Sequence, residues 1–187
     1  MDGQIGMFDD IEQYDVPENR RYSCFFTGHR KIPAKIRREL LAKMKNTVAY
    51  LYSKGVKEFH TGGALGFDTL AATQVIDMRR DHPDMNLILD LPCRNQTHRW
   101  SEADKRIYEF LLTNADIVNY AYDGEVGSTA EARKYLLMRN RIMANSSYYC
   151  VAYYSGQKSS GTGYTVNYAD GIGCEIINLY VRENEKL

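Results

Sequence analysis

The sequence predicts an α/β fold, a single Rossmann-like three-layer sandwich with a mainly parallel sheet. Two observations predict it. Short apolar segments alternate along the chain with longer segments of helical periodicity, as in parallel strands joined by right-handed helical crossovers. Three of the apolar segments run directly into glycine-rich turns, at Gly28, Gly62 and Gly161. In such folds ligands bind beyond the carboxyl ends of the strands, so we expect all three turns to lie along one functional edge.

Length and composition are those of one globular domain. The chain has 187 residues, of which 44% are hydrophobic and 26% charged, and that length is enough for one sizeable core. Basic and acidic residues both number 24, so the formal net charge is zero. A neutral chain disfavours a broad nucleic-acid face but is compatible with a local basic cleft.

No segment has the length of a membrane helix, and the amino terminus is unlike a signal peptide, so we expect a cytoplasmic protein with no membrane partner. The four cysteines, at positions 24, 93, 150 and 174, lack the spacing of a metal site. Each lies in or beside a predicted strand. We therefore expect buried, reduced thiols and no metal ion.

The predicted domain covers residues 21–182. Residues 1–20 lack periodicity and mix Gly, Asp, Glu, Asn and Pro, which predicts a flexible N-terminal tail, and residues 183–187 form a charged C-terminal tail. The predicted strands are residues 23–27, 56–61, 86–91, 116–120, 148–153 and 174–180. The third of them, with its Leu-Ile-Leu-Asp-Leu run, is typical of a strand buried on both faces.

Helical periodicity is clearest in the segment between Pro33 and Gly55. Apolar residues recur there every three or four positions, proline suits a first helical turn, and glycine suits a C-terminal stop. The other helices are expected from the Gly62 turn to about residue 80, around residues 107–111, over residues 129–145, and from the Gly161 turn to residue 170.

The turn around Gly62 is the main candidate for a ligand-binding site. Its sequence is His-Thr-Gly-Gly-Ala-Leu-Gly-Phe-Asp, between a strand and a helix. Glycines allow the backbone to approach a ligand, and the first amides of a helix attract anions. The alternative is that these glycines serve only tight strand-to-helix packing.

Five stretches of the chain resemble the SLOG superfamily, the Rossmann-like proteins that unite the Smf/DprA and LOG families. The resemblance is to its uncharacterised YoqJ/YpsA-like branch. The stretches are residues 24–30, 62–72, 92–96 with Trp100, 139–143 with Ser147, and 161–169. The resemblance implies a protein that binds a nucleotide or nucleotide derivative and forms a homodimer.

Two better understood groups in this superfamily imply different activities. LOG proteins hydrolyse the N-glycosidic bond of nucleoside 5′-monophosphates with a glutamate that falls here on Asn167 or Thr165, and neither of these is a general base. DprA-like proteins share the Gly-Gly-Ala-x-Gly-x-Asp and Arg-Asn-Arg-Ile sequences and bind single-stranded DNA. Such binding generally needs a basic groove with stacking aromatic residues.

We expect phosphates to lie on the amides of the Gly62–Gly66 and Gly161–Gly163 turns, with Arg30 and Arg141 as counter-charges. No cofactor is obligatory in this hypothesis; the ligand is an adenine nucleotide, an ADP-ribose-like compound or a cyclic nucleotide. The predicted ligand-binding residues are Thr27, Gly28, His29, Arg30, Gly62, Gly63, Ala64, Gly66, Asp68, Gln96, Arg141, Gly161, Thr162, Gly163 and Thr165.

Several of these residues also have purely structural interpretations. Asp68 is either a helix-start carboxylate or a ribose acceptor. Trp100 is either core or a stacking platform. Because Arg139 and Arg141 lie on one helix and face different ways, we expect Arg141 at the site and the other arginine paired on the surface. If the protein is an enzyme, Asp68, Asp123 and Glu125 are the candidate acids, although the last two also fit solvated loop positions.

Overall fold

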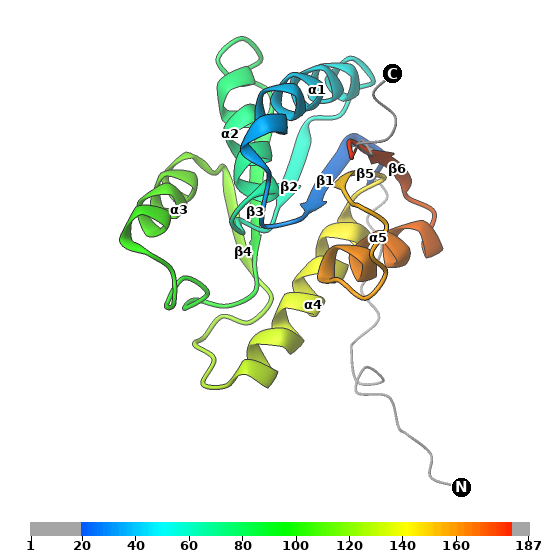
Figure 1. Cartoon of the computed structure of the whole chain (residues 1–187). Helices are drawn as coiled ribbons and strands as arrows, with labels where there is room; N and C mark the ends of the chain where they lie inside the picture. Colours follow the sequence, from blue (N-terminus) through cyan, green and yellow to red (C-terminus); the bar gives the residue numbers. More distant parts are fainter. Residues whose placement is uncertain (1–19, 181–187) are drawn as a thin grey trace, which may run out of the picture.

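The computed structural model describes residues 20–180 (Figure 1). Six strands form one sheet, and every pair of neighbouring strands is parallel. This confirms the predicted α/β class. The expected tails, residues 1–20 and 183–187, lie outside the described residues except for Arg20. That residue opens a short 3-10 turn, η1 (Arg20–Tyr22).

The strand order places the first strand in the middle of the sheet. From one edge to the other the order is β4-β3-β2-β1-β5-β6. The strands are β1 (Ser23–Gly28), β2 (Glu58–Thr61), β3 (Asn86–Leu91), β4 (Ile117–Tyr120), β5 (Tyr149–Tyr153) and β6 (Glu175–Asn178). Each predicted strand is present, and the ends differ by at most a few residues. The order reverses between β1 and β5, and in open parallel sheets this is where a ligand crevice forms.

Helices cover both faces of the sheet (Figure 1). They are α1 (Ala34–Ser53), α2 (Phe67–Met78), α3 (Glu102–Asn114), α4 (Thr129–Ser146) and α5 (Gly161–Gly171). Alternate side chains of β1 point to opposite faces. Phe26 accordingly packs in a cluster with residues of α1, α2 and α3, whereas Phe25 packs with residues of α4 and α5.

The β4 edge is less covered than the rest of the sheet. Ile117 of β4 is 46% exposed, and Phe110 of α3 is 48% exposed. By contrast, β1, β3, β5 and the neighbouring Leu111 are almost entirely buried. Apolar surface therefore remains at one edge of the described fold.

The three predicted glycine turns follow β1, β2 and β5 and lie at the carboxyl ends of these strands, as expected. The four cysteines are buried and free. Within residues 20–180, no helix is long and apolar enough to cross a lipid bilayer.

Candidate functional site

The turns after β1 and β2 fit against each other closely. The amide N–H of Phe67 donates to the carbonyl oxygen of His29 (3.3 Å). Gly66 has φ +88°, and a Cβ there would overlap the backbone carbonyl of Arg30. A Cβ at Gly28 would come within 2.5 Å of the Phe67 ring. These contacts require glycine on structural grounds, and they fix the backbone of Arg30 beside the start of α2.

Two adjoining cavities lie along this edge of the sheet. The larger, of about 690 Å³, is lined by the end of β1, the start of α2, the inner face of α4 and the turn before α5. The smaller, of about 490 Å³, lies between the loop after β3 and the start of α4. Arg30, Ala64 and Leu136 line both. Each volume is in the range of small-molecule sites.

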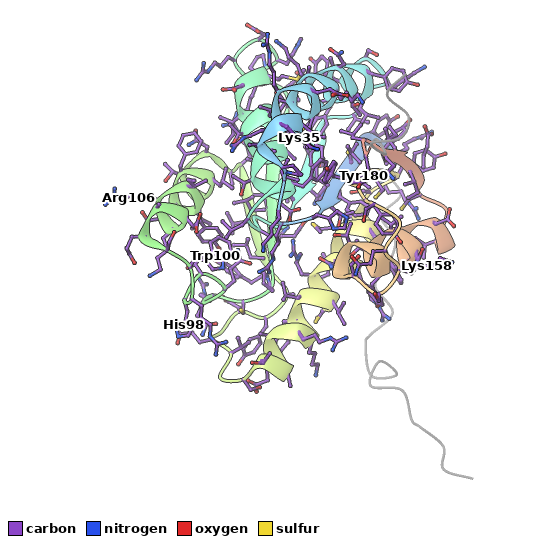
Figure 2. The ribbon with its side chains drawn as sticks, viewed as in Figure 1. Lys35, His98, Trp100, Arg106, Lys158 and Tyr180 are labelled. Carbon is purple, nitrogen blue, oxygen red and sulfur yellow. The ribbon has the colours of Figure 1, made fainter. Side chains whose placement is uncertain are left out.

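Basic side chains dominate the larger cavity. Arg30, Arg133, Arg139 and Lys158 line it, and Asp68 is the one carboxylate. Figure 2 shows Lys158 beside α5, while His98 and Trp100 lie on the loop that leads into α3. A local basic cleft therefore exists although the whole chain is neutral, because charge is concentrated at this edge.

A buried ion pair forms part of the cavity wall. Nη1 of Arg139 lies 3.5 Å from Oδ2 of Asp68, and both side chains are almost fully buried. A Cβ at Gly62 would overlap Nη1 of Arg139, so this glycine makes room for the guanidinium group. Burial raises the pKa of Asp68, and the charge of Arg139 and a hydrogen bond from the Ala64 amide oppose that shift.

A second polar cluster lies behind this pair, at the carboxyl ends of β2, β3 and β4. Nδ1 of His60 lies 2.7 Å from Oδ2 of Asp90, and the Asn119 amide donates to the other carboxylate oxygen (2.9 Å). Within the described residues, Nε2 of His60 and Nε of Arg139 are buried without a hydrogen-bond partner. Buried polar atoms usually have a partner, and these are two of the six side-chain atoms in the described residues that lack one.

His29 follows β1 and holds the loop before α5. Its Nε2 accepts a hydrogen bond from the Ser155 amide (3.1 Å) and lies 2.9 Å from the Ser155 hydroxyl. Burial lowers the pKa of His29. Nε2 can accept a hydrogen bond only when the imidazole is neutral. The lowered pKa favours the same neutral form. The ring lines the larger cavity, as the sequence led us to expect.

In the turn before α5, some backbone amides already form hydrogen bonds within the protein. Ser160 caps the helix by accepting a hydrogen bond from the Gly163 amide (3.0 Å). A Cβ at Gly163 would come 2.6 Å from the Gln157 carbonyl oxygen. Gly161 and Thr162 line the larger cavity. The helix start thus offers an anion the amides of Gly161 and Thr162 rather than that of Gly163.

The structure corrects the expected orientation of the two arginines on α4. Arg139 enters the larger cavity, whereas Arg141 is absent from its lining. Nε of Arg141 donates to the Tyr164 hydroxyl (2.7 Å), and its guanidinium group lies 5.2 Å from the centre of the Tyr168 ring. It therefore supports the packing of α4 on α5.

Thr165 is also used between these helices. Its buried hydroxyl accepts a hydrogen bond from the Asn140 amide (2.8 Å) and donates to the Gly161 carbonyl oxygen (2.9 Å). Both capacities of the hydroxyl are used within the protein. These two contacts explain why a threonine stands here without any ligand. A ligand-binding role for Thr165 therefore stays a prediction.

Of the three candidate acids, Asp68 alone lines either cavity. Asp123 accepts a hydrogen bond from Nε of Arg94 (2.6 Å) at the surface, and Glu125 is exposed. Asp104, which the sequence analysis did not select, lines the smaller cavity but is bonded to the helix-capping Ser101. Among residues 20–180, no group of three or more His, Cys, Asp or Glu side chains is placed to hold a metal ion.

Gln96 and Trp100 both line the smaller cavity. The indole packs edge-on against Tyr108, with ring centres 5.6 Å apart at 77°. Trp100 is partly buried, packs on Tyr108 and lines the cavity, and its role as a stacking platform stays a prediction. Gly63, with φ +60°, lies close to Gln96: a Cβ at Gly63 would be 3.6 Å from Nε2 of Gln96.

Comparison with known proteins identifies the family and the fold. The sequence profile of the YspA SLOG family matches residues 24–172. The chain belongs to that family. It is 33% identical over 142 residues to the uncharacterised SPbeta prophage-derived protein YoqJ of Bacillus subtilis, covering 72% of this chain and 80% of the relative. A UPF0398 protein of Bacillus cereus is 30% identical over 118 residues, 63% of this chain and 61% of the relative.

Solved structures with the same fold as this SLOG chain include two DNA processing proteins A. The Helicobacter pylori protein, described for its single-stranded DNA binding mode, gives a TM-score of 0.61 at 19% identity, over 87% of this chain and 67% of that one. The Streptococcus pneumoniae protein gives 0.62 at 17% identity, over 87% of this chain and 52% of that one. These identities establish a shared fold.

Sequence reasoning did not place three basic residues that line the larger cavity. Arg139 could have been found from helical spacing, since Leu136, Arg139 and Met143 share the inward face of α4. Arg133 lies one turn before Leu136 and follows from the same spacing. Lys158 comes from the turn before α5, where no periodicity indicates which side chains face the cavity.

Proposed function

We propose that this chain binds a nucleotide or nucleotide derivative in the larger cavity. The ligand class is an adenine nucleotide, an ADP-ribose-like compound or a cyclic nucleotide, and no other cofactor is required. The observation that carries the proposal is the charge of the cavity: four basic side chains line it, and its one carboxylate, on Asp68, is already paired with Arg139.

The polar groups at the rim suit phosphate. Arg30 and Arg133 offer guanidinium groups, which bind phosphate oxygens in pairs. The starts of α2 and α5 both point toward this edge, and helix N-termini favour anions. Apolar surface from Leu136, Leu137 and Met143 is available for the rest of the ligand.

Binding is better supported than hydrolysis of an N-glycosidic bond. A hydrolase needs a carboxylate that is free to act as acid or base near the sugar. Asp68 is committed to Arg139, and Asp123 and Glu125 lie outside the cavities. The arrangement suits a sensor, a sequestering protein or a regulatory module.

Native mass spectrometry with a nucleotide panel, followed by calorimetry, tests the proposal. We expect one class of nucleotide to bind, and Arg30→Gln and Arg133→Gln to weaken it at least about tenfold, the value of one charge-assisted hydrogen bond. Arg106→Gln is the matched control, because this exposed arginine lies on α3 away from the cavities (Figure 2). Equal affinity in all three variants, or no binding across the panel, contradicts the proposal.

Single-stranded DNA is the second candidate ligand. The two cavities adjoin at Arg30, and the smaller contains Trp100, so a basic path with an aromatic side chain runs along the edge. The shared fold with a DNA processing protein A whose single-stranded DNA binding has been described supports it. An oligo-dT titration separates the candidates: DNA binding falls steeply with salt, whereas a mononucleotide occupying one cavity responds weakly.

The homodimer expected from the family remains part of the proposal. We propose that the second copy binds at the β4 edge, where Ile117 and the neighbouring Phe110 leave apolar surface exposed. Two β4 strands related by a twofold axis would pair their open edges.

A further inference from the structure

The two adjoining cavities differ in the kind of side chain that lines them. The larger has four basic side chains and one carboxylate, which is paired with Arg139. Apart from the shared Arg30, the smaller has one arginine, one histidine and one carboxylate, and the rest of its wall offers an indole ring, side-chain amides, hydroxyls and apolar groups. A ligand with an anionic part and an uncharged, planar part would match this division.

Hydrogen bonds within the protein hold the walls of the smaller cavity in place. The side-chain amide of Asn95 donates to the carbonyl oxygen of Val126 (3.0 Å) and accepts from the Val126 N–H (3.0 Å), which joins the loop after β3 to the loop before α4. On the α4 side, a capping box between Ser128 and Glu131 fixes the first helical turn. The cavity is therefore preformed, which lowers the cost of ordering it around a ligand.

The amide of Gln96, unlike that of Asn95, is not used to hold the loops together. Its side chain lines the smaller cavity, and its Nε2 is buried without a hydrogen-bond partner beside Gly63 and Tyr108. Within residues 20–180, its Oε1 forms no hydrogen bond either. Because Nε2 is the buried end of the amide, Oε1 is the end that a ligand in this cavity meets. An amide oxygen accepts an N–H donor, and the exocyclic amine of adenine carries one.

The indole of Trp100 gives the same cavity a wall suited to a planar group. Its backbone N–H donates to the carbonyl oxygen of Thr97 (2.8 Å), and its ring packs edge-on against Tyr108, so the indole is held in position. Figure 2 shows Trp100 and Lys158 on either side of α4, and Leu136 of that helix lines both cavities. A ligand that reaches from one of these side chains to the other passes the place where the cavities adjoin.

We propose that the smaller cavity is the subsite for the base of the nucleotide, and that this base is adenine. Trp100 stacks on the purine, and Oε1 of Gln96 accepts a hydrogen bond from its exocyclic amine. The phosphates extend past Arg30 into the larger cavity. The inference rests on the proposed function in placing the phosphates there, and it adds which base is bound, where the base lies and which side chains select it.

Trp100 is the single tryptophan of the chain, so its fluorescence reports directly on the smaller cavity. The probes are adenosine 5′-diphosphate, inosine 5′-diphosphate and inorganic pyrophosphate. We expect the adenosine compound to quench the tryptophan emission, and pyrophosphate, which has no base, to bind without quenching. In calorimetry the adenosine compound should bind about tenfold more tightly than the inosine compound, in which an oxygen replaces the amine and leaves Oε1 of Gln96 without a donor.

Three variants assign the selectivity to named side chains. Gln96→Leu should bind the two nucleoside diphosphates with equal affinity. Gln74→Leu is the matched control, because this partly buried glutamine of α2 lines neither cavity, and it should keep the preference for adenine. Trp100→Leu should weaken both nucleoside diphosphates about tenfold, the value of one stacked base, and leave the affinity for pyrophosphate unchanged.

The outcomes separate this inference from the proposed function. Equal affinity for the two nucleoside diphosphates in the unaltered chain, a preference that persists in Gln96→Leu, or binding without quenching would overturn the inference. The proposed function would survive that result if pyrophosphate binds and Arg133→Gln weakens it. Quenching and an adenine preference with affinities unchanged in Arg30→Gln and Arg133→Gln would instead uphold the base subsite and contradict the proposed place of the phosphates.

Discussion

At the scale of single residues, the glycines that suggest a phosphate site are first explained by contacts within the protein. Gly62 makes room for the guanidinium group of Arg139, and Gly66 for the backbone of Arg30. Gly161 differs from them, because a Cβ there would meet nothing within 4 Å. The same residue type thus serves packing at two positions and leaves open space at a third.

This difference predicts opposite results for two similar substitutions. Gly62→Ala should displace Arg139 from Asp68 and destabilise the protein by about 3 kcal/mol, the cost of breaking a buried ion pair. Gly161→Ala, at an exposed helix start, should change stability by less than about 0.5 kcal/mol. Urea unfolding of both variants measures the difference. Equal stabilities would mean that Arg139 has another position of similar energy.

Sequence alone could locate most of these residues but not their partners. The turn sequences predicted that Gly28, His29 and Arg30 lie at the carboxyl end of a strand, and the structure places them at the end of β1, lining the larger cavity. The expectation that Arg139 pairs on the surface was wrong, because it ignored the apolar positions on the same face of α4. The burial of Asp68 against Arg139 joins residues 71 positions apart, a contact that no local pattern encodes.

At the scale of elements, the site is assembled from ends of strands and starts of helices. The β2 and β3 segments were predicted well because compact apolar runs define buried strands. The role of α3 was harder to predict: Ile107 and Phe110 contribute to its apolar periodicity, yet both are exposed. Periodicity shows that a helix is amphipathic, but not whether the covering partner belongs to the same chain.

The loop between β5 and α5 should respond to pH through His29. Burial lowers the pKa of this residue in the folded protein, so below pH 6.5 the unfolded chain takes up a proton that the folded chain does not. The stabilisation is therefore complete above pH 6.5 and declines as the pH falls toward the lower folded pKa. Protonation also removes the Nε2 acceptor of the Ser155 amide.

Hydrogen exchange at the Ser155 amide measures this response. After correction for intrinsic rates, we expect protection to fall between pH 7.5 and 5.5 in the unaltered protein. In His29→Gln, which retains an acceptor but does not titrate, protection should stay constant over the same range. If both proteins lose protection equally, the pH response of the loop has a source other than His29.

At the scale of the whole molecule, net charge says little about a local site. A total of zero disfavoured a broad nucleic-acid face but was compatible with a local basic cleft, and four cations line one cavity of the fold. Charges act over about a Debye length, roughly 8 Å at physiological salt, so the local distribution decides what a surface attracts. The net charge is a sum over the whole chain, so it does not show where on the surface the charges lie.

The uncovered β4 edge predicts the oligomeric state. An open strand edge with exposed Ile117 and Val118 lacks the charged residues that normally protect edges from pairing. We expect sedimentation velocity to show a dimer for the unaltered chain and a monomer for Ile117→Lys, because two lysines would face each other across the twofold axis. Tyr50→Lys, at a similarly exposed position on α1, should remain dimeric. A monomer at every concentration, or a dimer that survives Ile117→Lys, would remove β4 as the dimer surface and leave its exposed apolar residues to another partner.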